Sequence, residues 1–211
     1  MANPSNAITA QSTDIKGVIE KSVSVEFVAS TKKLIRTTGS WITDGYLVGM
    51  DITTTDAANL SVGKATLVTA LEMTVDGTVV NAVAGNETVT GKATIGEIKS
   101  FNGPGGQASD IDVTTLQSTA KEFRRGLQDE GEISFDVNLD PSDVGQIFCR
   151  TARAENVAPF GKRSFELVLP DATTTTLEFE AFVKGFSISG GVDAAVTASI
   201  SLRITGPVVW S

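Results

Sequence analysis

β-branched residues dominate this 211-residue chain, which holds 26 Thr, 22 Val and 14 Ile, together 62 residues. Their side chains lose rotamer freedom in helices and fit the pleated surface of strands, so this composition favours an all-β fold. The 20 glycines supply the turns that many short strands need. At this length, one large domain or one domain with a small second one can bury a core without a metal or a disulfide.

The residue types that most enzymes use are scarce. Histidine is absent and Cys149 is the only cysteine, which excludes histidine-based catalytic triads, intramolecular disulfides and cysteine zinc sites. The 17 Lys and Arg residues against 25 Asp and Glu residues give a net charge of −8. Because affinity for nucleic acid comes mainly from neutralised phosphates, this balance argues against a protein that grips DNA or RNA. We therefore expect a protein that is not an enzyme and that uses no metal and no cofactor.

The amino terminus carries no targeting signal. Residues 1–13 are polar and lack the basic start and apolar core of a signal peptide. No stretch approaches the roughly 18 apolar residues of a membrane span. We expect a protein that is made in a cytoplasm and has no membrane contact, with residues 1–17 as a flexible or partner-bound arm.

The periodicity of apolar residues divides the chain into three parts. Residues 1–30 hold the amino-terminal arm and a first strand at 18–29, in which apolar and polar residues alternate. Residues 31–92 form a small β module of uncertain role, with a two-residue hairpin turn predicted at Asp76-Gly77. Residues 93–211 form the main β domain. Strands of the module are expected near 32–37, 47–54, 64–71, 72–76, 78–83 and 87–90.

The main domain combines long two-faced strands with one helix. The helix is predicted over 141–155, with Asp140 as its N-cap and Pro141 in the first helical position. The apolar parity of one strand changes at Gly185, which indicates a β-bulge. Such strands predict a two-sheet β-sandwich with one flanking helix, or a piece of a larger barrel. The strands of this domain are expected at 94–101, 132–139, 164–169, 174–189 and 192–205.

The segment 103–131 is the feature that a simple sandwich does not explain. A loop of this length is uncommon unless it is functional or disordered. Its apolar residues, Ile111, Val113, Leu116, Phe123 and Leu127, are too many for a segment that moves freely in water. An ordered loop that needs a second surface suggests self-assembly.

Other motifs are better explained by structure than by chemistry. Gly103-Pro-Gly-Gly lacks the Gly-Lys-Ser/Thr of a phosphate loop, and the pair Asp110 and Asp112 lacks the glycine and glutamate of a calcium loop. Glu178 and Glu180 share one face of a strand as paired catalytic carboxylates can, but adjacency on one strand is not evidence of catalysis, and a solvated or lumen-facing acidic stripe explains them better. No catalytic and no metal-binding residue is predicted.

Several ordered segments of the chain together resemble one known family. They are 96–123 (GEIKSFNGPGGQASDIDVTTLQSTAKEF), 129–141 (DEGEISFDVNLDP) and 182–193 (FVKGFSISGGVD), followed by Ile204-Thr-Gly. These segments resemble the tail tube (major tail) proteins of long-tailed, lambda-like bacteriophages, over roughly residues 93–206. The segment 39–49 (GSWITDGYLVG), within the module 31–92, is similar to small β modules embedded in phage tail proteins.

The resemblance implies the fold and the function. It implies a two-sheet β-sandwich with one flanking helix, whose copies close into hexameric rings that stack into a tube through which phage DNA passes into the host. It also implies that the long loop and the amino-terminal arm join successive rings. The implied partners are the chain itself, the tape-measure protein, and the tail terminator and tail-tip proteins. The location would be the virion tail, after assembly in the host cytoplasm.

Charge and position along the chain indicate which residues would line the channel and which would join successive rings. Residues 93–211 carry a net charge of −6 and residues 1–92 a net charge of −2, so a channel lined by the main domain would repel phosphate. The predicted lumen-facing residues are Glu132, Asp136, Glu178 and Glu180. The predicted inter-ring contacts are Asp110, Asp112, Lys121, Phe123, Arg124 and Arg125.

Two other assignments stay open at this point. The chain could be the inner tube protein of a contractile tail or of a secretion system. It could also be a monomeric Ig-like decoration or adhesion protein of the virion, which would not polymerise at any concentration.

Overall fold

The computed structural model of the chain describes residues 10–155 and 161–211. These residues form strands almost throughout, with one α-helix and one short 3-10 turn. The elements are β1 (Asp14–Val28), η1 (Ala29–Thr31), β2 (Lys33–Arg36), β3 (Asp51–Thr54), β4 (Ser61–Val68), β5 (Glu72–Val75), β6 (Ala82–Thr94), β7 (Ile98–Asn102), β8 (Gln107–Asp112), β9 (Phe123–Asp129), β10 (Glu132–Asn138), α1 (Val144–Ala154), β11 (Lys162–Val168), β12 (Thr176–Ser189) and β13 (Thr197–Trp210). The predicted all-β class with a single helix is confirmed.

Eleven strands form one sheet in the order β2-β5-β4-β3-β6-β1-β11-β12-β13-β10-β7. Strand β2 also pairs with β1, so that β1, β2, β5, β4, β3 and β6 close into a six-stranded barrel, here called the small barrel. The remaining strands continue from β1 as the open sheet, β1-β11-β12-β13-β10-β7. The structure is therefore not clearly the predicted two-sheet sandwich, because a single sheet forms both the small barrel and the strands outside it.

The physical reason for this layering is the length of β1 and β6. They pair from Lys16↔Thr94 to Val25↔Gly85 without a register shift. The first residues of β1, Asp14–Val18, pair with β11 in the open sheet, and its last residues, Val25–Val28, pair with β2 in the small barrel. The predicted boundary at residue 92 lies inside β6, and Asp14–Gly17 of the predicted arm lie inside β1.

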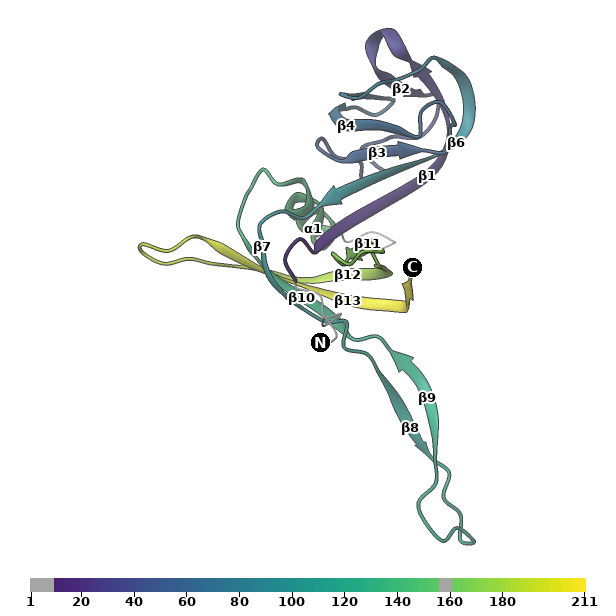
Figure 1. Cartoon of the computed structure of the whole chain (residues 1–211), viewed down its shortest axis with the longest axis vertical. Coiled ribbons are helices and arrows are strands. Elements are labelled where there is room, and N and C mark those ends of the chain that lie inside the picture. The colour runs from purple at the N-terminus through teal and green to yellow at the C-terminus, as the bar shows by residue number, and fades with distance from the viewer. Residues whose placement is uncertain (1–9, 156–160) are drawn as a thin grey trace, which may run out of the picture.

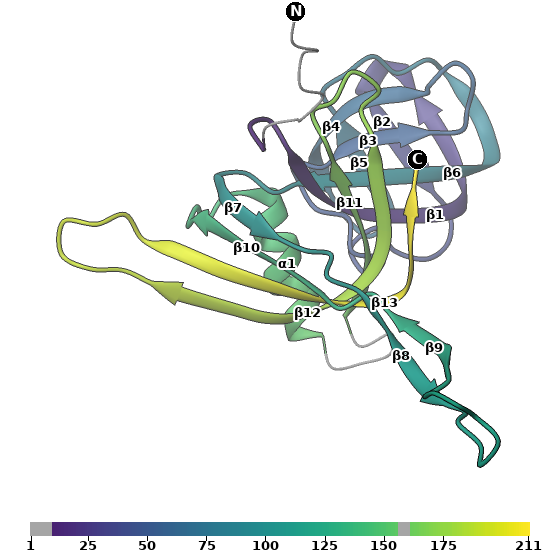
Figure 2. The same cartoon turned by 60° about the horizontal axis from the view of Figure 1, so that its bottom comes forward.

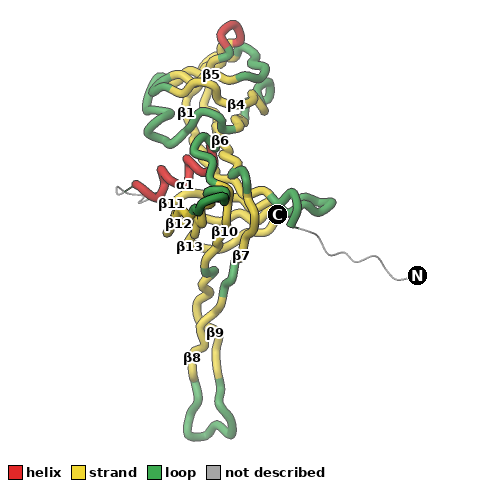
Figure 3. The backbone as a smooth tube through the Cα atoms, turned by 90° about the vertical axis from the view of Figure 1, so that its left-hand side faces the viewer, coloured by secondary structure: helices red, strands yellow, loops and turns green. Residues whose placement is uncertain are grey.

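The molecule is elongated. The small barrel lies at one end of its longest axis and the two-stranded sheet β8–β9 at the other, with the open sheet and α1 between them (Figures 1 and 3). The far ends of β12 and β13 project to one side of this axis (Figure 2). The buried apolar side chains form one cluster that extends through the small barrel and under α1.

Helix α1 covers one face of the open sheet. Phe148 packs edge-on against Phe165 of β11, with ring centroids 5.8 Å apart. A Cβ atom at position 17 would lie only 2.2 Å from the Phe148 ring, so Gly17 is required for this close approach of helix and strand. The helix begins later than predicted: Asp143, and not Asp140, is the N-cap, and its Oδ1 accepts a hydrogen bond from the amide of Gln146 at 2.8 Å. Asp140 instead accepts from the amide of Ser142 in the preceding turn.

Three predicted turns and loops differ from the structure. Asp76-Gly77 does not join a hairpin, because Asp76 accepts from the amide of Lys64 and the side chain of Asn59 holds Val80 in an irregular segment. Segment 103–131 contains the antiparallel pair β8–β9 in place of an irregular loop. Strand β13 begins at Thr197, so the residues before it, predicted as strand from Val192, form an exposed turn. The bulge at Gly185 is confirmed by a register shift between Val183 and Gly185.

Candidate functional site

The four predicted lumen-facing residues lie on one face of the open sheet. Glu132 and Asp136 of β10 pair with Arg203 and Ser199 of β13, and Glu180 of β12 pairs with Thr205 of the same strand. Residues opposite each other, or two apart along a regular strand, share a face of a sheet. Glu178, two residues before Glu180, therefore joins them. This side of the open sheet, opposite α1, is called the polar face below.

Two of these four carboxylates have a cationic neighbour. Lys184 lies 2.5 Å from Glu132, and Lys162 lies 2.8 Å from Glu180. Asp136 accepts a hydrogen bond from the hydroxyl of Ser100 at 3.4 Å. In the described part of the chain Glu178 has no ion-pair partner. The polar face is thus rich in charge, but its carboxylates are partly neutralised by lysines that the sequence analysis did not include.

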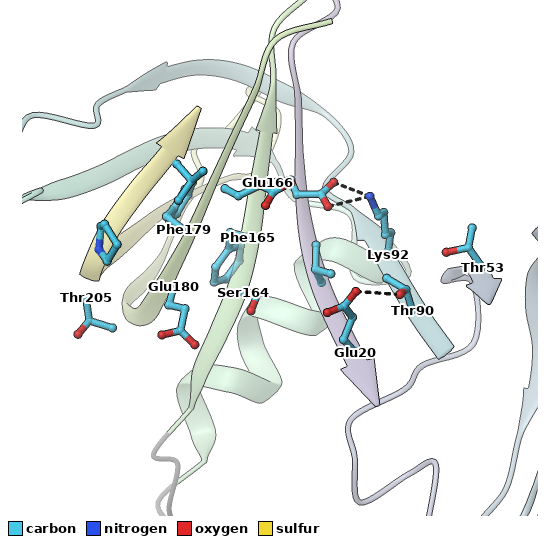
Figure 4. A pocket seen from close by; sticks show the side chains of 14 residues that line it. Glu20, Thr53, Thr90, Lys92, Ser164, Phe165, Glu166, Phe179, Glu180 and Thr205 are labelled. Atoms are coloured by element: carbon cyan, nitrogen blue, oxygen red, sulfur yellow. Dashed lines mark hydrogen bonds and ion pairs between the residues drawn. The ribbon is translucent and has the colours of Figure 1, made fainter. Parts of the chain in front are cut away.

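A shallow groove of about 580 Å³ lies where the polar face meets the small barrel. Figure 4 shows Glu166 directed toward Lys92, with a closest distance of 2.7 Å, and Thr90 donating to Glu20 at 3.2 Å. Glu166 is only 12% exposed, so its ion pair with Lys92 is largely shielded from water. The described residues include no group of three or more His, Cys, Asp or Glu side chains placed to hold a metal ion. The groove is therefore a polar surface without the arrangement of a metal centre.

The six predicted inter-ring residues all lie on one projecting structure. Residues 107–129 are called the hairpin below, and they consist of β8, β9 and the turn between them (Figure 1). Within it Asp110 pairs with Arg125, Ile111 with Arg124 and Asp112 with Phe123, while Lys121 lies in the turn. The structure thus brings the predicted set together, in a two-stranded ribbon and not in a loop.

The hairpin is exposed to solvent on both sides. Leu116 in the turn is 103% exposed and Leu127 in β9 is 91% exposed, and Ile111 and Phe123 are more than half exposed. Asp110, Lys121, Arg124 and Arg125 form no ion pair with other described residues. The hairpin therefore presents apolar and charged groups that nothing in the described chain covers.

The base of the hairpin is fixed firmly to the open sheet. Arg203 of β13 lies 2.6 Å from Asp129, whose other oxygen accepts from the amide of Gly131. The hydrogen bond from Gly131 and the contact with Arg203 lower the pKa of the Asp129 carboxyl. Hydrogen bonds from Thr114 likewise lower the pKa of Asp112 near the turn. Both carboxylates stay ionised at neutral pH.

A second exposed tip joins β12 to β13, and the sequence analysis missed it. Val192 is 95% exposed there, and Ile188 and Val196 are also exposed. The alternation of residues 192–204 assigned these valines to a buried strand face. Gly190 and Gly191 predict a turn at this point, but the turn extends to Val196, because β13 begins only at Thr197.

Comparison with known families finds a match to a segment that includes the hairpin. Residues 71–148 match the family model described as phage tail tube, TTP, lambda-like. The chain resembles lambda-like phage tail tube proteins. The matched segment begins just before β5, includes the barrel strands β5 and β6, and continues through β7, the hairpin and β10 into α1. It confirms the predicted family resemblance and, with it, a structural protein of the virion tail. It begins earlier than the predicted residue 93 and ends before β11.

Two solved structures align with part of this chain. One is the tail of an empty GTA particle with C6 symmetry, at 14% identity and a TM-score of 0.47, covering 57% of this chain and 86% of that chain. The other is the virion of a native gene transfer agent particle, at 15% identity and a TM-score of 0.48, covering 57% of this chain and 88% of that chain. No curated protein matches the chain. In the described residues no helix is long and apolar enough to cross a membrane.

Proposed function

We propose that this tail tube protein forms hexameric rings, which stack into the tube through which phage DNA passes. The observation that carries the proposal is the uncovered hairpin. An isolated two-stranded hairpin is at best marginally stable in water, and this one leaves its apolar side chains exposed. A second copy of the chain, stacked on the first, would cover these side chains and supply the missing core.

Stacking of this kind needs two different complementary patches on each subunit. Such heterologous contacts close into rings or continue as open polymers, depending on the rotation between copies. The charged residues that have no ion pair on the hairpin, Asp110, Lys121, Arg124 and Arg125, would set the register between rings. Of the predicted arm, residues 10–13 precede β1 and would contribute, whereas residues 14–17 belong to β1 and residues 1–9 lie outside the described residues.

The polar face would line the channel. It lies on the side of the open sheet opposite α1, and it carries Glu132, Asp136, Glu178 and Glu180. Carboxylates and hydroxyls on a channel wall repel phosphate or bind it weakly, so DNA would pass without adhering. The tape-measure protein would occupy this channel before the DNA, and the terminator and tail-tip proteins would contact the terminal rings.

Removal of the hairpin tests the stacking role. Gly105 and Gly131 lie side by side at its base, so residues 108–128 can be replaced by Asn-Gly, a two-residue turn between Gln107 and Asp129. We expect this variant to fold with an unchanged thermal midpoint and to form no long tubes in negative-stain electron microscopy. Wild-type protein, concentrated under the same conditions, should form hollow tubes.

A matched variant tests whether the exposed apolar side chains of the hairpin, and not only its length, are needed for stacking. Leu116→Ser with Phe123→Ser keeps the hairpin's length and removes two exposed apolar groups. We expect it to raise the protein concentration required for tube formation. Normal tubes from the hairpin-deleted protein would contradict the stacking role, and a wild-type protein that stays monomeric at every concentration would favour a decoration protein.

A further inference from the structure

The small barrel is the part of the molecule whose role the tail tube assignment leaves open. It is joined to the open sheet by two strands and not by a linker. Strands β1 and β6 cross from one unit to the other over ten consecutive residue pairs, Lys16↔Thr94 to Val25↔Gly85, without a register shift. An uninterrupted ladder of backbone hydrogen bonds allows no hinge between the two units. The orientation of the small barrel is therefore determined by the orientation of the open sheet.

The polar face continues across this junction. Glu178 of β12 lies opposite Glu166 of β11, and Glu166 binds Lys92 of β6 at 2.7 Å. Two residues before Lys92 on β6, the hydroxyl of Thr90 donates to Glu20 of β1 at 3.2 Å. The two side-chain contacts connect β11, β1 and β6 on one side of the sheet, as Figure 4 shows for Glu166, Lys92, Glu20 and Thr90, and Glu178 of β12 lies beside them through its pairing with Glu166.

The same ladder extends into the barrel wall. The hydroxyls of Ser22 and Thr88 lie 2.8 Å apart, two residues beyond Glu20 and Thr90 along their strands. Thr53 of β3 pairs with Thr90 and lines the same groove. The odd-numbered neighbours Ile19 and Val25 point the other way and are buried in the common core. The outer wall of the small barrel is thus the direct continuation of the polar face.

We propose that this wall, formed by Glu20, Ser22, Thr53, Thr88 and Thr90, prolongs the lining of the channel, so that the small barrel is part of the channel wall and not a decoration on the outside of the tube. The inference rests on the proposed function, because it takes the polar face as the lumen side. The wall carries hydroxyls and one carboxylate, Glu20, that has no ion pair among the described residues. Its chemistry therefore matches that of a surface over which a polyanion slides.

The strand order also predicts which side of the barrel faces outward. In the ring β1-β2-β5-β4-β3-β6, strands β4 and β5 lie opposite β1 and β6. Thr66 of β4 is exposed on that opposite side. It provides a control position of similar size and polarity to Ser22.

Thiol labelling of assembled tubes tests the proposal. The test compares Ser22→Cys with Thr66→Cys, and Thr88→Cys provides a second lumen position in case Ser22→Cys does not assemble. Wild-type protein serves as the blank, because burial raises the pKa of the Cys149 thiol to about 12 and keeps it unreactive. Each protein is treated before and after assembly with N-ethylmaleimide and with maleimide coupled to streptavidin, which is too bulky to pass along the channel.

We expect both reagents to label both variants before assembly. In tubes the bulky reagent should label Thr66→Cys and fail to label Ser22→Cys or Thr88→Cys. Equal labelling of Ser22→Cys and Thr66→Cys by the bulky reagent in well-formed tubes would overturn this inference alone. Protection of Thr66→Cys would contradict the predicted outward side. The absence of tubes from wild-type protein would instead count against the proposed function.

Discussion

At the residue scale, the most consequential polar group is Arg36 in the small barrel. Its side chain is 5% exposed, donates to Asp44 at 2.7 Å and lies over the ring of Trp41 at 4.7 Å. Removal of one partner leaves a poorly solvated charge, so we expect Arg36→Met to lower the free energy of unfolding by about 3 kcal/mol. Lys33→Met, a change on the same strand that breaks a partly exposed ion pair with Glu72, should cost about 1 kcal/mol or less. Urea unfolding of both variants measures the difference, and equal losses would contradict it.

At the element scale, the start of α1 depends on one carboxylate. Asp143 accepts from the amide of Gln146 at 2.8 Å and, through its other oxygen, from the amide of Gly96 at 3.1 Å. It therefore caps the helix and ties it to the strand connection before β7. We expect Asp143→Ala to lower the free energy of unfolding by about 1–2 kcal/mol, the usual cost of a lost N-cap. Asp140→Ala is the matched control, and thermal unfolding should show a smaller loss for it.

At the scale of the whole molecule, the shared strands predict a single unfolding transition. Because β1 and β6 belong to both the small barrel and the open sheet, neither unit can unfold while the other keeps its full sheet. In a Trp210→Phe background, the fluorescence of buried Trp41 reports on the small barrel. Reaction of the buried Cys149 thiol reports on α1 and the open sheet. We expect both signals to change at the same urea concentration. An earlier transition of Trp41 would show that the small barrel unfolds independently.

Local patterns predicted most of the strands because burial on one side of a sheet imposes a period of two. The alternation in 132–139 matches β10 closely, and the parity change at Gly185 matches an observed bulge. The same rule failed for residues 192–196, where the alternation continues although the chain has left the sheet. The sequence of one chain does not show whether apolar side chains in an exposed turn are buried, because their burial depends on contacts with other molecules.

The sequence analysis named candidate residues for the polar face and the hairpin, and the tertiary structure shows how these residues are arranged. The acidic residues of the polar face share a side of the open sheet as expected, but Lys162 and Lys184 lie beside two of them through pairing between distant strands. The six hairpin residues were expected in a loop. Their strand pairing was hidden because charged and polar residues in an exposed ribbon need no alternation when neither side is buried.

Composition and local periodicity were enough to determine the all-β class, the single helix and most strand positions, and the family resemblance came from short sequence segments. Each of these depends on residues near one another along the chain. The closure of β1–β6 into a barrel, the sharing of β1 and β6 with the open sheet and the continuity of the polar face were decided only by the tertiary structure. They depend on pairing between strands that lie far apart along the chain: Lys16 of β1 pairs with Thr94 of β6, 78 residues later, and Asp14 pairs with Val168 of β11, 154 residues later. That choice is made by the packing of one common core, and similar strands would fit more than one partner locally.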